Sequence, residues 1–474
     1  MNNFFDNKNK SDIIQYIKEL YYHDERPWIV GYSGGKDSST VTQLIFETLK
    51  ELKSQKRELH KKVNIIFADT LVENPIITDF IDEILDNMQL KAKELNLPIN
   101  VQKVYPDYKE SFWTLLIGRG YPSPRQKFRW CTDRLKIRPT TRFIKKQLSE
   151  YNEVIVVLGV RKGESASRDQ VLNNSKIDGK ILRRHQSLNN AYILSPIENF
   201  TENDVWQYLL NSNTELNNND FYSPYGTNNN TLYQLYRDSD AECPMTLTKD
   251  TKACGNSRFG CWTCTVVKTD KSLKGFIDSG EDWLKPLEIY RQYIYNIRDV
   301  REKREKKRRN GKVYTITKDG EEKIGLGPFT LEARKEMLRK LLKTEKEIIK
   351  LNKKMNKHCL IKPEELKLIR EEWIESGDIE DSLPKIYEEV YQEKLPWSYD
   401  EKFLFDQKEI SLLTELCEEE GIEPELIKKL ISIEENNIGY KYRHNIYNKI
   451  YKLLQQDWIH YDEIKNISEN LDVE

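Results

Sequence analysis

Three short runs of apolar residues interrupt the mixed pattern in the first part of the chain. They cover residues 28–32, 63–68 and 154–158. Continuous apolar runs of this length are typical of strands that are buried on both faces of a parallel sheet. Between them, apolar positions recur at helical spacing, most clearly in 40–52. Strand and helix therefore alternate, which predicts an α/β fold with a doubly wound parallel sheet.

The pattern changes near residue 270. Strand-like runs give way to long, charged amphipathic stretches, of which 330–353 is the clearest. A glycine- and proline-containing segment, 325–328, precedes that stretch and is typical of a boundary. The length of 474 residues exceeds that of one ordinary domain. We therefore expect an α/β domain in 1–270, with a cysteine-rich insert, and a C-terminal α-helical domain in 271–474.

The carboxyl ends of the three expected strands carry polar residues. The first run is followed by Ser-Gly-Gly-Lys-Asp-Ser at 33–38, the second by Asp69, and the third by Gly159 and Arg161. Open α/β sheets bind their ligands outside this edge of the sheet. We therefore expect these residues to share one site.

The segment 33–38 has the composition of a phosphate-binding loop. Where a strand leads into a helix, backbone N–H groups and the helix N-terminus can hold an anion. The glycines let the backbone approach a ligand closely, the lysine adds a positive charge, and the serines add hydroxyl donors. It is not a Walker A loop, because GxxxxGK[ST] is absent. An ordinary turn is the alternative, but the position between a buried strand and an amphipathic helix favours a phosphate site. The candidate cofactor-binding residues are Ser33, Gly34, Gly35, Lys36, Asp37, Ser38, Asp69, Gly159 and Arg161.

The cysteines are crowded. Four of the seven fall within 243–264, and Cys261 and Cys264 form a CxxC pair. Such a pair brings two thiolates to one centre, and more distant cysteines can complete four ligands. Tetrahedral zinc and a [4Fe–4S] cluster fit this spacing equally well, and the local sequence alone favours zinc. Cys359 and Cys417 have no cysteine neighbours, and we interpret both as unligated.

The distribution of charge is a weaker indication of function than the loop and cysteine motifs. The formal net charge is −1, so composition does not indicate a nucleic-acid binder. Basic residues nevertheless gather at 301–309, and they alternate with aromatic residues at 121–138. Such segments suit a nucleic-acid groove, but a solvated helix face is the alternative. The chain carries no stretch typical of a signal peptide or a membrane span, and we expect a cytoplasmic protein without a membrane partner.

The loop SGGKDS resembles the signature of the PP-loop pyrophosphatase superfamily, an adenine nucleotide alpha hydrolase-like fold, letter for letter. Members cleave ATP between the α and β phosphates and transfer AMP to an acceptor oxygen. The resemblance implies that the loop holds the pyrophosphate part of ATP, with Mg²⁺ screening its charge. It also implies catalytic roles for Lys36 and Asp37, the latter as a metal or water contact.

Two further segments resemble the sulfonucleotide reductases. The stretch 194–200 followed by Asp-Val-Trp at 204–206 is similar to their DVW segment. Cys131, with Arg134 and Lys136, is similar to the CCxxRK segment of the iron–sulfur members, although Trp130 replaces the first cysteine. This resemblance implies iron–sulfur chemistry in preference to zinc.

A closer resemblance covers most of the chain. Residues 254–267, with Glu-Cys-Pro at 242–244 ahead of them, look like the DndC family, the PP-loop subunits of bacterial DNA phosphorothioation systems. The segments 163–165 and 327–334 also resemble that family. The implied cluster ligands are Cys131, Cys254, Cys261 and Cys264, which leaves Cys243 as a spare thiol able to carry a persulfide; the reverse roles of Cys243 and Cys254 are the alternative.

The implied activity is an ATP-dependent sulfurtransferase with ATP pyrophosphatase activity. It would activate a DNA backbone phosphate by adenylylation before sulfur displaces AMP. The implied partners are the DNA backbone, contacted in part by 301–309, a cysteine desulfurase and other phosphorothioation subunits. The alternatives are an adenylyl-sulfate or phosphoadenylyl-sulfate reductase that consumes no ATP, a tRNA-thiolating enzyme, and a non-catalytic iron–sulfur DNA-binding module.

Overall fold

The chain divides into two compact units. The computed structural model describes residues 3–163, 177, 181–211, 221–240, 260–318, 321–397, 405, 407–435, 437 and 445–458. The first unit comprises Met1–Pro106 and Arg129–Lys285, and the second comprises Asp107–Phe128 and Pro286–Glu474. This division differs from the predicted boundary at 270. The segment Asp107–Phe128 groups with the C-terminal residues, because its residues 114–118 contact the helices at 331–351 and 363–375.

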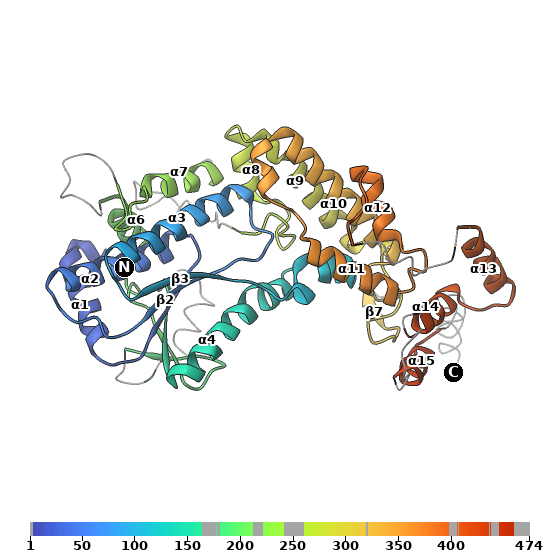
Figure 1. Ribbon diagram of the computed structural model, residues 1–474, viewed down its shortest axis with the longest axis horizontal. Helices are drawn as coiled ribbons and strands as arrows, with labels where there is room; N and C mark the ends of the chain where they lie inside the picture. Colours follow the sequence, from blue (N-terminus) through green and yellow to red (C-terminus); the bar gives the residue numbers. More distant parts are fainter. Residues whose placement is uncertain are drawn as a thin grey trace. The chain divides into compact units, whose positions relative to one another are not determined.

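A six-stranded sheet forms the centre of the first unit (Figure 1). Its order is β3-β2-β1-β4-β6-β5, and all neighbours are parallel except β5, which is antiparallel to β6. The doubly wound, mostly parallel sheet predicted from the apolar runs is therefore confirmed. The strands are β1 (Trp28–Tyr32), β2 (Val63–Ala68), β3 (Ile99–Val104), β4 (Val154–Val157), β5 (Arg183–Arg184) and β6 (Ala191–Leu194).

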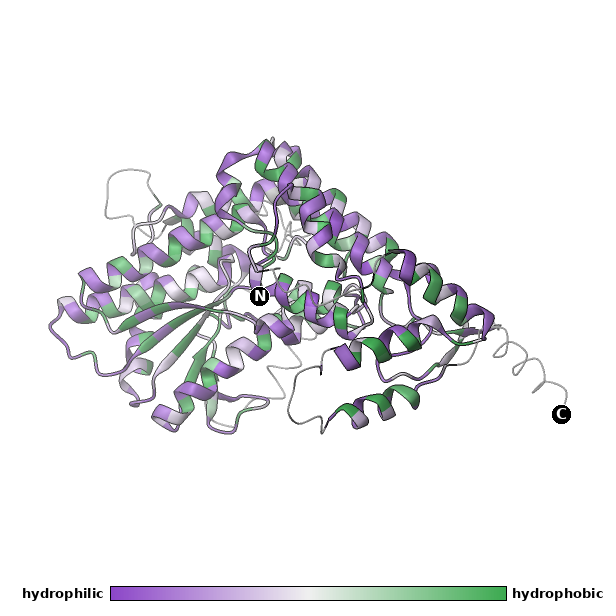
Figure 2. Ribbon diagram, turned by 45° about the vertical axis from the view of Figure 1, so that its right-hand side comes forward, coloured by the Kyte–Doolittle hydropathy of each residue, from purple (hydrophilic) through white to green (hydrophobic). Residues whose placement is uncertain are grey.

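Helices cover both faces of this sheet. Figure 1 shows α3 on one side and α4 on the other. On the α4 face, Ile144 packs with Ile29, Ile66 and Val156 in one buried cluster. The strands are largely apolar, whereas the helices alternate apolar and polar stripes (Figure 2). The helices of this unit are α1 (Lys10–Tyr22), α2 (Lys36–Ser54), α3 (Pro75–Glu94), α4 (Arg138–Tyr151), α6 (Glu202–Asn211), α7 (Asn229–Asp240) and α8 (Lys271–Asp278), with short helical turns η1 (Phe4–Asp6), η4 (Thr132–Ile137) and η5 (Asp282–Leu284).

The second unit is mainly helical, which confirms the expected C-terminal helical region. Its core joins α10 and α11 to the segment 107–128, where Trp113 donates to the Leu360 carbonyl (2.6 Å) and Trp373 donates to that of Ile117 (2.8 Å). The elements are α9 (Lys285–Asn296), α10 (Leu331–Leu351), α11 (Pro363–Glu375), α12 (Ser382–Tyr391), α13 (Gln407–Glu419), α14 (Pro424–Glu435) and α15 (Ile446–Leu454), the hairpin β7 (Thr315–Lys318) and β8 (Glu321–Ile324), and short turns η2 (Tyr108–Glu110), η3 (Thr114–Gly118), η6 (Ile297–Asp299), η7 (Arg301–Lys303) and η8 (Lys353–Lys357).

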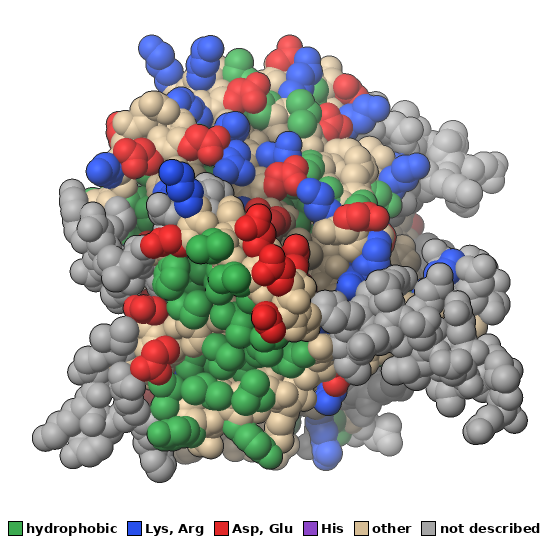
Figure 3. Space-filling view, turned by 90° about the vertical axis from the view of Figure 1, so that its right-hand side faces the viewer, with side chains coloured by type: hydrophobic (Ala, Val, Ile, Leu, Met, Phe, Trp, Pro, Cys, Tyr) green, Lys and Arg blue, Asp and Glu red, His purple; other side chains and the backbone are tan. Residues whose placement is uncertain are grey.

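One face of the second unit is rich in apolar side chains, with Asp and Glu beside them (Figure 3). The exposed large apolar residues of α13 and α15 are Leu412, Leu416, Tyr447, Tyr451 and Leu454. Contiguous apolar surface of this kind is uncommon on proteins that act alone. In the part of the chain that the structure describes, none of the helices has both the length and the apolar character that a membrane crossing requires.

Candidate functional site

The loop 33–35 connects the buried strand β1 to the first turn of α2. Gly34 has a φ of +76°, in the left-handed region that favours glycine. Ser38 holds the loop closed: its Oγ accepts from the Ser33 N–H (3.1 Å) and donates to the Gly35 carbonyl (2.9 Å). Gly35 is the N-cap of α2 and has no side chain to cap the helix. The Lys36 N–H at the start of this 19-residue helix donates to the Tyr236 hydroxyl (3.2 Å), and the following N–H groups of the first turn are available to an anion.

The loop lies at the point where the strand order reverses. Strand β2 flanks β1 on one side and β4 flanks it on the other. In open α/β sheets this crevice is the usual ligand site. After β4, Gly159 brings its backbone against the start of α2: a Cβ there would lie 2.7 Å from the carbonyl carbon of Asp37 and 2.9 Å from the Ser38 nitrogen. Only glycine allows this approach, so the structure brings the predicted residues of β1 and β4 together.

Charged side chains surround the start of α2. Arg161 Nε donates to Asp37 Oδ1 at 2.5 Å. The Lys36 ammonium lies 3.3 Å from Glu202 Oε1 and 3.9 Å from Asp37 Oδ2. Burial lowers the pKa of Lys36, but the neighbouring Tyr236, Asp37 and Glu202 outweigh it, and the pKa lies above its usual value. Lys36 is therefore a buried, fully protonated cation beside the loop.

Tyr236 of α7 completes this arrangement. Its hydroxyl accepts from the Lys36 N–H (3.2 Å), and its ring lies 5.1 Å from the Lys36 ammonium. Trp206 packs edge-on against the Tyr236 ring with centroids 5.2 Å apart. Asp204, fully buried, accepts from the N–H groups of Phe5 (3.1 Å) and Thr201 (2.7 Å). The DVW segment thus packs, through Trp206, against the tyrosine that contacts the loop 33–38.

Asp69 follows β2, the neighbour of β1. Its Oδ1 accepts from the Leu71 N–H (2.9 Å), and Lys103 donates to its Oδ2 (3.2 Å). The side chain is 9% exposed. The structure thus places Asp69 at the predicted edge of the sheet, where one of its carboxylate oxygens accepts a hydrogen bond from the loop that follows β2.

The three described cysteines of the predicted ligand set lie in the first unit. The backbone of Cys261 forms an isolated antiparallel β-bridge with that of Glu73. The Cys261 Sγ lies 3.3 Å from the Thr70 hydroxyl. The Cys264 N–H donates to the Cys261 carbonyl (3.0 Å), as expected for a tight CxxC turn. Burial raises the pKa of the Cys131 thiol, and the neighbouring Cys264 raises it further. Cys131 thus lies in the same unit as the CxxC pair, although 130 positions separate it from Cys261 in the chain.

A cation and a carboxylate accompany these thiols. Lys136 lies 3.5 Å from Glu73, which is the main reason that its pKa is raised. Within the described residues, no three His, Cys, Asp or Glu side chains are arranged to hold a metal ion. Cys243 and Cys254 lie outside those residues, as do Glu164 and Ser165 of the predicted 163–165 segment. The described thiols alone therefore do not form a cluster site.

Three residues of this site were not among the sequence candidates. They are Tyr236, Glu202 and Glu73. A lone tyrosine in an amphipathic helix and an acidic residue in a first helical turn carry no local signal. Their roles depend on chain segments that meet only in the fold.

Comparisons with known proteins find one family model and one curated relative with similar sequences. A family model described as the phosphoadenosine phosphosulfate reductase domain matches residues 27–267. An uncharacterized protein of Methanocaldococcus jannaschii, MJ0066, is 25% identical over 280 residues, which cover 59% of this chain and 45% of that protein. The chain thus spans less than half the length of this curated relative.

Two solved structures are similar at low identity. Phosphoadenylyl-sulfate reductase from Candida auris, in a phosphate complex, is 14% identical with a TM-score of 0.28, covering 44% of this chain and 80% of that chain. FMN adenylyltransferase from Candida glabrata, in complex with FAD and inorganic pyrophosphate, is 16% identical with a TM-score of 0.27, covering 43% of this chain and 57% of that chain.

The matched range 27–267 begins just before β1 and ends just after Cys264, so it contains the loop 33–38, the sheet and the described cysteines of the first unit. Because it covers half of the chain, the protein belongs to the phosphoadenosine phosphosulfate reductase domain family.

Proposed function

We propose that the protein is an ATP-dependent sulfurtransferase that converts a DNA backbone phosphate into a phosphorothioate, as in the DndC family that its sequence resembles. The observation that carries the proposal is the loop 33–38 at the switch point of the sheet, with the buried Lys36 cation beside it. A leaving pyrophosphate needs such a cluster of N–H donors and positive charge. A reductase that consumes no ATP has no pyrophosphate to stabilise.

The first chemical step is adenylylation. A non-bridging oxygen of the DNA phosphate attacks the α-phosphorus of ATP, the bond from that phosphorus to the α–β bridging oxygen breaks, and pyrophosphate leaves with the electron pair. Lys36 and the N–H groups at the start of α2 neutralise the charge that develops on it. Arg161 fixes the Asp37 carboxylate at 2.5 Å. Bound Mg²⁺ would screen phosphate charge, and Asp37 is the candidate carboxylate for it.

The second step replaces oxygen by sulfur. The terminal sulfur of a cysteine persulfide attacks the activated phosphorus, and AMP leaves with the electrons of the P–O bond. A thiol then cleaves the S–S bond, which leaves sulfur on the phosphate and a disulfide behind. Cys243 is the proposed carrier, and a cysteine desulfurase would load it. Other phosphorothioation subunits would complete the system, and the exposed apolar residues of α13 and α15 supply a surface suited to protein contacts.

The proposal includes a [4Fe–4S] cluster held by Cys131, Cys254, Cys261 and Cys264. Its support is the resemblance of residues 254–267 and of the segment around Cys131 to the iron–sulfur members of these families. Protein purified without oxygen should contain about four iron atoms per chain and show a broad visible band from thiolate-to-iron charge transfer. A colourless zinc protein would contradict the cluster and leave the loop chemistry intact.

The decisive experiment measures pyrophosphate and AMP released from ATP in the presence of DNA. Lys36→Ala should lower the rate by about a hundredfold or more, because it removes charge from the leaving group. Lys50→Ala is the matched control, since Lys50 is an exposed residue of the same helix, and its rate should equal that of the wild type. Reduction of adenylyl sulfate by a thiol, without ATP cleavage, would refute the proposal in favour of the reductase.

A further inference from the structure

Two sequence segments that the ATP chemistry does not use meet at one cavity in the second unit. The basic run 301–309 supplies Lys307, Arg308 and Arg309, and the segment 327–334 supplies residues from Pro328 to Arg334. The cavity has a volume of about 440 Å³. A water molecule occupies about 30 Å³, so the cavity is far larger than a bare phosphate requires and lies in the range of small-molecule sites.

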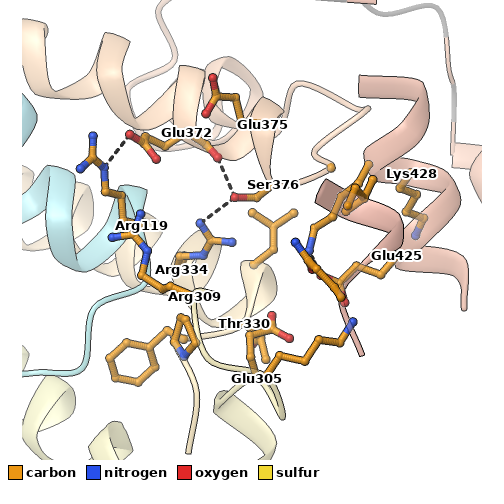
Figure 4. A pocket seen from close by; sticks show the side chains of 18 of the residues that line it. Arg119, Glu305, Arg309, Thr330, Arg334, Glu372, Glu375, Ser376, Glu425 and Lys428 are labelled. Atoms are coloured by element: carbon orange, nitrogen blue, oxygen red, sulfur yellow. Dashed lines mark hydrogen bonds and ion pairs between the residues drawn. The ribbon is translucent and has the colours of Figure 1, made fainter. Parts of the chain in front are cut away.

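The floor of the cavity is the N-terminus of α10. Thr330 caps that helix by accepting from the Ala333 N–H (3.2 Å). Arg334, in the first turn, is 6% exposed and lines the cavity (Figure 4). Its Nη1 donates to the Gly118 carbonyl and to Ser376 Oγ, but its Nε–H has no hydrogen-bond partner in the described part of the chain. A helix N-terminus and a buried donor without an acceptor together indicate an anion site.

More positive charge lies around the opening. Arg308, Arg309 and Lys428 line the cavity and make no ion pair with any described residue. Arg309 lies over the ring of Tyr121, with 4.9 Å to the centroid, so its guanidinium is positioned without being neutralised. The Lys307 ammonium lacks a hydrogen-bond partner among the described residues and lies over the Trp458 ring.

Five acidic side chains also line the cavity, and they only partly offset this charge: Glu332 is paired with Lys335 at 3.1 Å, and Glu375 has no ion pair with any described residue. Glu372 is paired with Arg119 at 2.6 Å, and Glu425 is paired with Lys429. Burial raises the pKa of Glu305, which favours its neutral form. Apolar walls complete the cavity: Pro328, Phe329, Leu331, Ile433 and Leu453. A ligand that is complementary to both the basic side chains and the apolar wall carries an anionic group at one end and a flat, weakly polar body at the other.

We propose that this cavity binds a nucleoside phosphate, with its phosphate toward the α10 N-terminus, Arg309 and Lys428 and its base or sugar toward the apolar wall. The nucleotide could be free or part of a DNA strand, because the recognised chemistry is the same. The DNA source rests on the proposed function and deepens it: the second unit then holds the acceptor strand by a nucleotide, and its basic run serves substrate binding.

The test uses the full-length protein and a fluorescein-labelled thymidine oligonucleotide of about 12 nucleotides, followed by fluorescence anisotropy. Arg309→Ala and Lys428→Ala should each weaken binding about tenfold and reduce the salt dependence by about one counterion. Both side chains are at the surface or only partly buried, so the variants should fold, which thermal melting checks. Lys350→Ala, an exposed residue at the opposite end of α10, is the matched control and should bind as the wild type does.

Free thymidine monophosphate separates the two sources. If it displaces the oligonucleotide, and both variants weaken its own binding, the cavity accepts free nucleotides as well as strands. If it fails to compete while the variants still weaken oligonucleotide binding, the cavity accepts a nucleotide within a strand; both results support the inference. Unchanged binding of both probes by both variants would overturn it.

The same preparations distinguish this inference from the proposed function. Oligonucleotide binding that depends on Arg309 and Lys428, in a wild type that releases no pyrophosphate, would sink the sulfurtransferase proposal and leave the cavity assignment standing. Pyrophosphate release combined with variant-independent binding would sink the cavity assignment alone.

Discussion

Glu365 makes the stability of the second unit depend on pH. Its side chain is 1% exposed in the first turn of α11, and one carboxylate oxygen accepts from the Lys362 N–H (2.8 Å). Burial is the main cause that raises its pKa from 4.5 to about 7. Each pKa unit corresponds to about 1.4 kcal/mol, so ionising Glu365 in the folded state costs about 3 kcal/mol.

The sign of this pH dependence follows from which state, folded or unfolded, binds the Glu365 proton more tightly. The folded state binds the proton more tightly, so this stabilising contribution is complete below about pH 4.5 and is lost as the pH rises through about 7. Glu365→Gln keeps the volume and cannot ionise. It should therefore be about 3 kcal/mol more stable than the wild type at pH 8, and the difference should shrink toward zero near pH 5.

Hydrogen exchange of α11 peptides at pH 5 to 8 measures the local opening free energy without assuming that the whole chain unfolds in one step. Glu364→Gln is the matched control, because Glu364 is exposed beside Glu365, and it should follow the wild-type profile. A wild-type-minus-Glu365→Gln difference that stays constant from pH 5 to 8 would refute the reasoning.

Three other substitutions test the site and its supports. Gly159→Ala should lower pyrophosphate release at least tenfold, because its Cβ would lie 2.7 Å from the Asp37 backbone and displace the start of α2; an unchanged rate would contradict this close approach. Asp204→Ala should lower the free energy of unfolding, measured with urea, by about 3 kcal/mol, since the part-buried N–H groups of Phe5 and Thr201 both lose a fully buried acceptor; a loss under about 1 kcal/mol would contradict it. Thr330→Ala should cost about 1 kcal/mol by hydrogen exchange of the first α10 turns, and an effect spread evenly over α10 would not fit loss of a cap.

The buried strands could be predicted closely from the sequence. Residues 28–32 and 63–68 match β1 and β2 residue for residue, because these strands are covered on both faces and their apolar runs are continuous. The missed strand β3, INVQKV at Ile99–Val104, lies at the sheet edge and is largely half-buried, so polar residues interrupt its pattern. The helix expected over 330–353 is α10, whose cap is Thr330.

The grouping of the segment 107–128 could not be predicted. Its apolar residues look like any core segment, and it follows β3 directly in the chain. Long-range contacts assign it to the second unit, among them those of Trp113 with Leu360 and of Trp373 with Ile117, each between residues more than 240 positions apart. Such long-range pairing leaves no local pattern in either partner.

The same distinction explains which parts of the candidate site were visible in the sequence. Residues that contact one ligand from one loop need a fixed spacing in the sequence, so Ser33 to Ser38 form a recognisable sequence motif. The residues that support the loop have no such constraint: Tyr236 contacts the Lys36 N–H across 200 positions of chain. Trp206, the last residue of the DVW segment, packs against that tyrosine. A segment that resembles the sulfonucleotide reductases in sequence thus packs in the fold against the tyrosine that contacts the loop 33–38.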